Sequence, residues 1–194
     1  QTRAGETITY YGGKPKEKLP GGETTYAGFG PDWANAANTP FRFYKATQHE
    51  GGVRTPLVIH WPAGQTAERG SISAEPGHVI DLMATCLEAA GAEYPRVYGE
   101  HAITPHEGRS LLPLLRGAKP SEREAIYFEH QGSRAVRTER WKLVARGKGS
   151  WELYDFHHDQ TETNDLAGKH PEIVEELAAK WQAWAERANV LAEK

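Results

Sequence analysis

The stretch that decides the fold reads Tyr44-Lys45-Ala46-Thr47-Gln48-His49-Glu50-Gly51-Gly52-Val53-Arg54-Thr55-Pro56, and it runs into Leu57-Val58-Ile59-His60-Trp61-Pro62. A polar loop with charged side chains and two adjacent glycines is followed by a short apolar segment that ends at a proline. Short, nearly continuous apolar runs are typical of buried strands in parallel sheets. We therefore expect a strand over residues 55–61, and before it a loop on the rim of an active site.

Two side chains of this loop could carry chemistry. Lys45 offers a compact ammonium with three donors, which suits a sulfate or phosphate oxygen. His49, four residues later, could bind the same oxygens or donate a proton. From the spacing alone, a solvated surface lysine and a structural histidine explain these residues at least as well. Glu50 and Arg54 could simply pair with each other and brace the loop.

The composition excludes several classes of protein. The chain has 194 residues, of which 38% are hydrophobic and 25% are charged, a balance too polar for a membrane span. A net charge of -3 with dispersed basic residues argues against a nucleic-acid partner. Cys86 is the single cysteine, so neither an internal disulfide nor a cysteine metal cluster can form. Because Cys86 falls on the apolar stripe of a predicted helix, we expect a buried thiol.

The first half of the chain predicts long irregular stretches and two helices. Residues 1–40 are rich in turn formers and lack an apolar period, so we expect a long loop there. A helix is predicted over residues 77–90, with Gly91 placed to end it. Ser110 could cap a short helix that runs to Leu115.

The pattern changes after Pro120. Four short segments at 125–129, 134–137, 141–146 and 151–155 are separated by turn residues, which predicts an antiparallel meander. A final helix should begin at Pro171, a favoured first helical residue. Its apolar stripe, which should pack on the meander, consists of Val174, Leu177, Trp181, Trp184 and Ala188.

Several longer blocks carry a resemblance to a known family. In chain order they are Phe29-Gly30-Pro31-Asp32-Trp33-Ala34-Asn35-Ala36-Ala37-Asn38-Thr39-Pro40-Phe41-Arg42, Tyr44-Lys45 with His49-Glu50-Gly51-Gly52, Gly77-His78-Val79-Ile80-Asp81-Leu82, Glu107-Gly108-Arg109-Ser110-Leu111-Leu112-Pro113-Leu114-Leu115-Arg116-Gly117, and Trp151-Glu152-Leu153-Tyr154-Asp155 with Asp159, Glu162, Thr163, Asn164, Asp165 and Leu166. Their order from about residue 26 to residue 190 resembles the C-terminal portion of bacterial arylsulfatases, in the sulfatase family of the alkaline phosphatase superfamily.

The resemblance implies an α/β fold: the C-terminal part of an alkaline-phosphatase-like sulfatase fold, ending in a small four-stranded antiparallel sheet packed on a C-terminal helix. Residues 1–120 would then belong to the catalytic α/β domain, with 1–40 as a long loop on the rim of the active site. Residues 121–194 would form the small C-terminal domain.

The resemblance also implies functional roles. Lys45 would contact the substrate's sulfate, with His49 as a less certain second catalytic contact, and Trp33 and Asn38 could line the substrate entrance. The family uses calcium and a formylglycine made within a Cys/Ser-x-Pro-x-Arg motif. Cys86 is followed by Leu87-Glu88, which does not fit that motif. The calcium ligands of the family come from an Asp-Asp pair and an Asp-Asn pair, and no Asp-Asn pair stands ahead of Lys45. The resemblance thus implies no metal ligand in this chain, and a nucleophile and calcium ligands in an upstream, N-terminal part of the same enzyme.

The expected partners are thus a small sulfate ester or a sulfated glycan and the missing N-terminal part, with no nucleic acid and no membrane. A periplasmic or secreted location is plausible for the family, although no signal region is present to decide it. The leading hypothesis is a sulfuric ester hydrolase, with the isolated chain inactive. A phosphatase or phosphonate ester hydrolase of the same superfamily and a non-catalytic structural fragment remain as alternatives.

Overall fold

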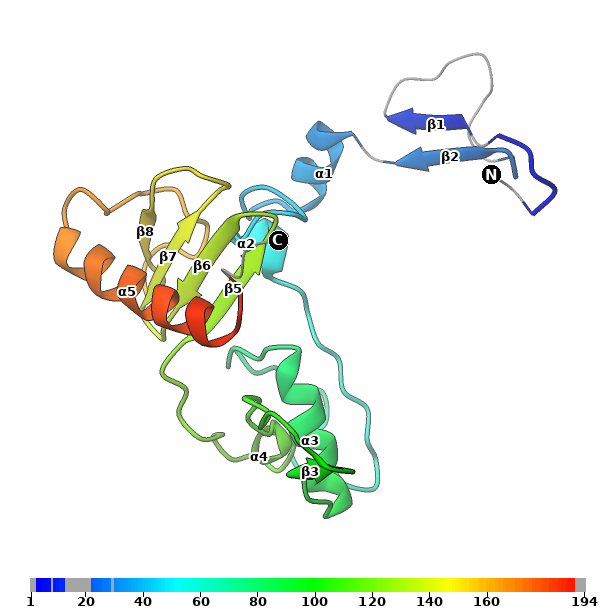
Figure 1. Cartoon of the computed structure of the whole chain (residues 1–194), viewed down its shortest axis with the longest axis vertical. Coiled ribbons are helices and arrows are strands. Elements are labelled where there is room, and N and C mark those ends of the chain that lie inside the picture. Colours follow the sequence, from blue (N-terminus) through cyan, green and yellow to red (C-terminus); the bar gives the residue numbers. More distant parts are fainter. Residues whose placement is uncertain (1–2, 8, 13–21, 29, 191–194) are drawn as a thin grey trace. The chain divides into compact units, whose positions relative to one another are not determined.

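The computed structural model describes residues 3–7, 9–12, 22–28 and 30–190. The chain divides into two compact units, one from residues 1–55 and 127–194 and one from residues 56–126. Figure 1 shows the elements, which are β1 (Thr9–Gly12), β2 (Thr25–Gly28), α1 (Pro31–Ala37), α2 (Glu50–Val53), α3 (Ile80–Ala90), β3 (Val97–Tyr98), β4 (His101–Ala102), α4 (Leu112–Leu115), β5 (Ile126–His130), β6 (Ser133–Arg137), β7 (Trp141–Ala145), β8 (Glu152–Asp155) and α5 (Pro171–Arg187). None of the described helices is long and apolar enough to cross a membrane.

The predicted meander is confirmed. Strands β5, β6, β7 and β8 form a four-stranded sheet in chain order, and β6–β7 and β7–β8 pair antiparallel. The turn between β5 and β6 uses Gln131 and Gly132, both with positive φ (52° and 81°). Two consecutive positive φ values match the twist of the flanking strands, which is why this two-residue connection closes the hairpin.

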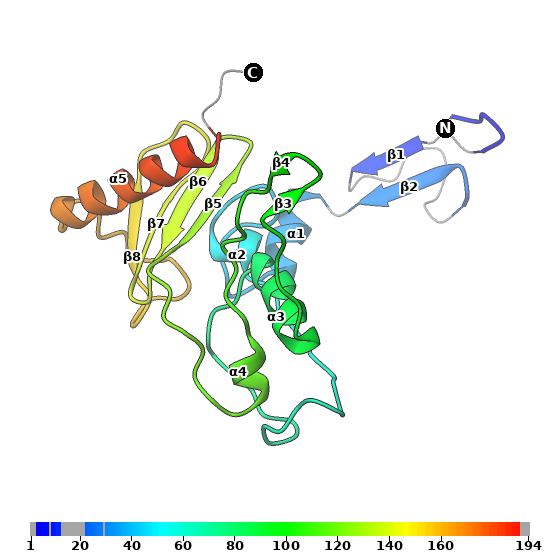
Figure 2. The ribbon, with the colours of Figure 1, turned by 60° about the horizontal axis from the view of Figure 1, so that its bottom comes forward.

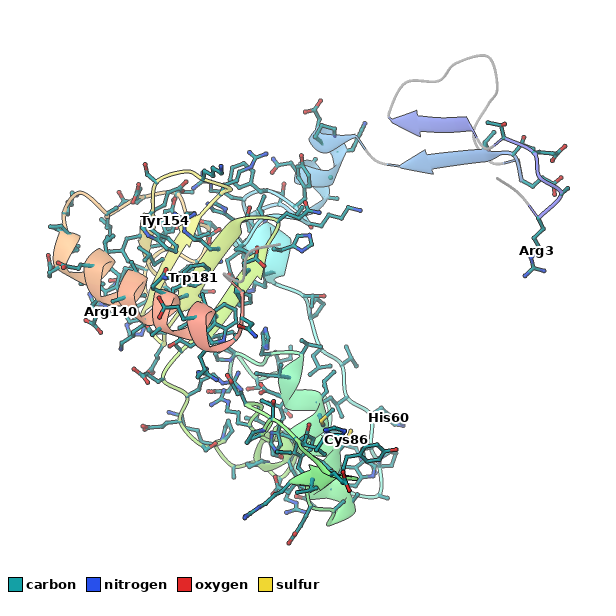
Figure 3. All side chains as sticks on the ribbon, in the orientation of Figure 1. Arg3, His60, Cys86, Arg140, Tyr154 and Trp181 are labelled. Atoms are coloured by element: carbon teal, nitrogen blue, oxygen red, sulfur yellow. The ribbon has the colours of Figure 1, made fainter. Side chains whose placement is uncertain are left out.

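The predicted C-terminal helix is also confirmed and covers one face of this sheet (Figure 2). Leu177, Trp181 and Ala185 are its buried residues, at 2%, 6% and 0% exposure. The indole nitrogen of Trp181 (Figure 3) donates to the carbonyl of Phe128 at 3.0 Å, and Trp184 stacks on Tyr127 with ring centroids 5.3 Å apart. Apolar burial and two aromatic contacts thus fix α5 on the sheet.

The opposite face of the sheet is partly apolar and partly charged. Side chains alternate between the faces along a strand, so Lys142 and Val144 of β7 share a face, as do their cross-strand partners Tyr154 and Glu152. A core cluster on this face consists of Ala135, Val144, Tyr154 and Phe156, with Phe128 packed against it. Helix α2 lies on this side, away from α5, in Figures 1 and 2.

The prediction that residues 1–40 are all loop is wrong in its described part. β1 and β2 pair in parallel, and α1 begins at Pro31, whose fixed φ suits a first helical residue. The grouping of residues 1–55 with the C-terminal sheet also differs from the predicted boundary at residue 120. Whether residues 1–120 belong to a catalytic domain stays a prediction.

The unit formed by residues 56–126 contains α3, which ends at Gly91 in the left-handed conformation (φ 62°), as predicted. Asp81 is fully buried and accepts hydrogen bonds from the backbone nitrogens of His78 (2.8 Å) and Arg109 (3.0 Å) and from the Arg123 guanidinium. Burial by itself would raise the pKa of Asp81, but these donors outweigh it and lower that pKa. Arg123 and Asp81 therefore hold the start of α3 in place.

Two predictions for this unit are wrong. Residues 55–61 form no strand in the structure, and Val58 is 89% exposed, since no neighbouring strand among the described residues supplies ladder hydrogen bonds. Cys86 (Figure 3) is exposed rather than buried. The buried side of α3 is the one with Asp81 and Ala84, whereas Leu82 and Met83 are 41% and 53% exposed. The apolar stripe that contains Cys86 thus lacks a cover among the described residues.

Candidate functional site

The loop that carries Lys45, residues 38–49, is held in shape by hydrogen bonds between asparagine side chains and its backbone. Phe43 and Ala46 have positive φ angles, 62° and 74°, a backbone conformation that residues other than glycine rarely adopt. Asn38 braces the turn, because its amide nitrogen donates to the Phe43 carbonyl at 3.1 Å. The Asn35 side chain accepts from the Phe43 backbone nitrogen at 2.9 Å. The loop conformation is therefore over-determined by its neighbours.

The two glycines of α2 allow the backbone to fold back on this loop. The Gly51 nitrogen donates to the Arg42 carbonyl at 2.9 Å. A Cβ atom at Gly51 would lie 2.2 Å from the Phe43 carbonyl oxygen, and one at Gly52 would lie 2.1 Å from the Thr47 carbonyl oxygen. Both distances are far below van der Waals contact, so only glycine fits at these positions.

Arg42 fastens the N-terminal end of the loop to the sheet. Its guanidinium donates to the Tyr154 hydroxyl at 2.6 Å, the Glu162 carbonyl at 2.8 Å and the Glu152 carboxylate at 3.1 Å. Burial alone would lower the pKa of Arg42, but the attraction of Tyr154 and Glu152 raises it. Arg42 therefore remains charged in its half-buried position.

His49 lies at the C-terminal end of the loop and is completely buried. Its Nε2 is 3.3 Å from a Glu152 oxygen, and its ring meets Phe43 edge-on at 4.8 Å between centroids. Burial lowers the pKa of His49 to about 4, although Glu152 acts in the opposite direction. A neutral, buried imidazole in contact with Glu152 positions the loop, and its Nδ1 is without a partner among the described residues.

Glu50 connects the loop to a buried cluster of three charged side chains. Lys142 of β7 is fully buried, with its Nζ 2.7 Å from a Glu50 oxygen and 2.8 Å from a Glu162 oxygen. The backbone nitrogen of Glu50 donates to the other Glu162 oxygen at 2.8 Å. Burial raises the pKa of Glu162, although the charge of Lys142 opposes this effect. Lys142 is thus the close, buried partner of two buried carboxylates that lie beneath the loop.

Lys45 lies in sequence between Arg42 and Glu50, the two charged residues that fasten the loop to the sheet, and it is exposed. Its ammonium forms no hydrogen bond or ion pair with the part of the chain that the structure describes. The structure therefore brings Lys45 together with Asn38 and His49 on one braced loop. Trp33 is on α1 and is 70% exposed. The substrate roles predicted for Lys45, His49, Trp33 and Asn38 stay predictions, and the contacts of Asn38 and His49 are those of loop-bracing residues.

The sequence analysis missed the residues that hold the loop. The pairing of Glu50 with Arg54 occurs, but at 3.8 Å, whereas the short ion pair of Glu50 is with Lys142. Lys142 and Val144 are two positions apart on β7 and therefore lie on the same face of the sheet. A charged residue next to an apolar one on a strand face is the signal that could have identified Lys142. Its partner Glu162, 20 residues further along, gives no comparable signal.

The described residues contain no group of three or more His, Cys, Asp or Glu side chains placed to hold a metal ion. They therefore do not fit a calcium ion as a resident cofactor.

Comparisons with known proteins identify the class to which this fold and loop belong. The family model described as N-sulphoglucosamine sulphohydrolase, C-terminal, matches residues 41–187, which include the loop, the sheet and α5. The chain belongs to the sulfatase family and represents its C-terminal portion.

Curated relatives agree with this assignment. An uncharacterized sulfatase of Schizosaccharomyces pombe is 31% identical over 88% of this chain and 32% of its own length. The steryl-sulfatase of Mus musculus is 33% identical over 79% of this chain and 22% of its own length. The chain thus spans about a third or less of the length of these relatives.

A solved structure supports the fold. The crystal structure of Ps i-CgsB matches with a TM-score of 0.61 at 24% identity, over 76% of this chain and 32% of that chain. The predicted fold, a C-terminal part of the alkaline-phosphatase-like sulfatase fold with a four-stranded sheet and a C-terminal helix, is confirmed.

Proposed function

We propose that this chain is the C-terminal part of a sulfuric ester hydrolase, in which Lys45 binds the sulfate group of the substrate. The observation that carries the proposal is the contrast along one loop. The neighbours of Lys45 are fastened to the sheet through Arg42 and Glu50, whereas the ammonium of Lys45 is exposed and has no partner among the described residues.

This contrast supports a ligand role on energetic grounds. A flexible surface lysine needs no rigid support, yet here a half-buried charged cluster around Arg42, a buried one around Lys142 and two glycines fix the backbone on either side. A cation held in place before the substrate arrives costs no reorganisation when charge develops. Such preorganisation is the arrangement expected of a group that neutralises sulfate oxygens during ester cleavage.

In this proposal the residues of the chain bind and orient, and do not supply the nucleophile. Lys45 offers N–H donors and a positive charge to the non-bridging sulfate oxygens. Arg42, Glu50 and Lys142 position Lys45 from behind without touching the substrate. The pKa of His49, near 4, makes its neutral form the relevant one at pH 7, so it acts as a bracing group.

The calcium ion and formylglycine expected from the family resemblance would have to be held by other residues. A bound calcium would supply positive charge to the sulfate oxygens, and the described residues here offer no ligand set for it. No step of the proposal passes through either group. The substrate would be a small sulfate ester or a sulfated glycan, and relatives are named for both kinds, as a steryl-sulfatase and as an N-acetylgalactosamine-6-sulfatase.

The test compares this chain and the complete product of the reading frame that encodes it, assayed with 4-nitrophenyl sulfate and 4-nitrophenyl phosphate in the presence of calcium. We expect sulfatase turnover by the complete product and none by the 194 residues alone. The substitution Lys45→Ala should lower kcat/KM for the sulfate ester by roughly 10²-fold, the usual effect of removing one group that stabilises developing charge.

The matched control is Lys148→Ala, which removes an exposed lysine from another loop of the same unit and should change kcat/KM for this monosulfate less than twofold. A Lys45→Ala enzyme with full activity would remove Lys45 from the site. A preference of the complete product for the phosphate ester would favour the phosphatase alternative.

A further inference from the structure

Arg146 directly follows β7, and its guanidinium contacts the aromatic ring of Phe43 in the Lys45 loop. Its guanidinium is 5.1 Å from the centroid of the Phe43 ring. The guanidinium of Arg42 is 5.0 Å from the same centroid. Phe43 stands two positions before Lys45, so two arginines converge on the base of the loop that carries the candidate sulfate-binding lysine.

The two arginines differ in how their charge is balanced. Arg42 is paired with Glu152 at 3.1 Å. Arg146 is exposed, and its guanidinium forms no ion pair with any residue in the described ranges. By contrast, Arg140, next to β7, forms an ion pair with Asp155 at 2.9 Å, and the guanidinium of Arg134 on β6 donates to the Gly147 carbonyl at 2.8 Å.

The segment that follows Arg146 is rigid rather than free. Arg134 donates to the carbonyls of Gly147 and Gly149, at 2.8 Å and 3.3 Å. The Gly147 nitrogen donates to the Ser133 hydroxyl at 3.1 Å, and the Gly149 nitrogen to the Arg146 carbonyl at 2.9 Å. A basic side chain on a backbone held by four hydrogen bonds can act as a fixed contact, which is the role proposed above for Lys45 on its own loop.

The charges that are left form an excess. Lys45 and Arg146 are exposed, and neither has a carboxylate partner within the described segments. Glu50 and Glu152, which belong to the same unit, are already engaged by Lys142 and Arg42. Unbalanced cations on neighbouring rigid segments produce a local positive potential, although the chain carries a net charge of -3.

We propose that Arg146 is a specificity-determining residue that binds a second anionic group, a sulfate or carboxylate, on the same substrate whose first sulfate meets Lys45. The preferred substrate is then polyanionic, such as a glycan that bears more than one sulfate. This inference rests on the proposed role of Lys45. The small C-terminal sheet then supplies a substrate contact of its own.

The experiment measures binding to the 194-residue chain by ¹⁵N NMR titration with two probes. Phenyl sulfate carries one sulfate group, and benzene-1,3-diyl bis(sulfate) carries two on the same ring. For Arg146→Ala we expect the affinity for the bis-sulfate to fall about fivefold, as for one exposed charge contact, and that for phenyl sulfate to change less than twofold. The difference should vanish at 1 M NaCl because of screening.

Arg140→Ala is the matched control, since it removes an exposed arginine that is already paired, and it should affect neither probe. Equal losses for both probes in Arg146→Ala, or no loss for either, would overturn the second subsite. Lys45→Ala distinguishes the two proposals. If it leaves both affinities unchanged, the role of Lys45 fails, whatever the result for Arg146. If it weakens both probes while Arg146→Ala weakens neither, only the second subsite fails.

Discussion

Replacement of Lys142 by methionine is the most direct test of the buried cluster under the Lys45 loop. Methionine retains the length and the apolar stem of the side chain but removes the ammonium. Glu50 and Glu162, which are 1% and 0% exposed, would then lose the cation that lies between them, and Arg54, 3.8 Å from Glu50, would remain as a more distant partner. The hydrogen bond from the Glu50 backbone nitrogen to the Glu162 carboxylate would remain as the direct link between them.

The magnitude follows from the cost of an uncompensated buried charge. Breaking a buried pair by removing one partner typically destabilises a protein by about 3–5 kcal/mol. Glu162, whose pKa is already raised by burial and lowered by Lys142, can reduce this cost by taking up a proton, so its pKa should rise further. A carboxyl group with a pKa raised in the folded state contributes stability that is lost as pH rises. The destabilisation should therefore be smaller at pH 5 than at pH 8.

The assay is urea unfolding followed by tryptophan fluorescence, which Trp181 and Trp184 at the sheet–helix contact should report. Arg140→Ala, which breaks an ion pair whose arginine side chain is 52% exposed, should cost no more than about 1 kcal/mol. The variant Lys142→Met/Glu162→Gln should recover part of the loss. A change below about 1 kcal/mol for Lys142→Met, or one that is equal at pH 5 and pH 8, would refute the reasoning.

Two further predictions concern the same loop. The pKa of His49 is lowered from 6.5 to about 4, so the unfolded chain binds more protons between these values; stability should be full above about pH 6.5 and fall by up to about 3 kcal/mol as pH drops towards 4. His49→Gln should flatten this pH dependence in urea titrations, and an unchanged slope would contradict the assignment. Gly51→Ala should destabilise the chain by roughly 1–3 kcal/mol, since its Cβ would meet backbone oxygens at 2.2 Å and 2.3 Å. Gly168→Ala, where nothing lies within 4 Å, is the control; equal thermal midpoints for the two variants would refute the packing argument.

Local patterns were sufficient where an element depends on its own residues. The meander follows from short alternating segments and from turns such as Gln131-Gly132, whose positive φ values suit a tight hairpin. Helix α5 follows from Pro171 and an apolar stripe with helical spacing. The one member of that stripe that is exposed is Ala188, just beyond the last helical residue, while Ala185 takes the buried position.

Local patterns failed where an element depends on a neighbour. Residues 55–61 have the composition of a buried strand, but a strand needs a ladder partner, and the described chain provides none. Apolar spacing likewise places Cys86 on the apolar stripe of a helix. Whether Cys86 is buried depends on whether another element covers that stripe, and here it is exposed. In both cases periodicity predicts the character of a surface without specifying what packs on it.

The sequence by itself determined the family of this chain, the meander and the last helix, because these depend on local spacing and on the order of blocks along the chain. Only the tertiary structure decided why the Lys45 loop is rigid. Lys142 and Glu50 are 92 positions apart, and Glu50 and Glu162 are 112 apart, yet they share one buried cluster. These contacts arise because Glu50 and Glu162, from two distant segments, both reach Lys142 of β7, and no local period encodes them.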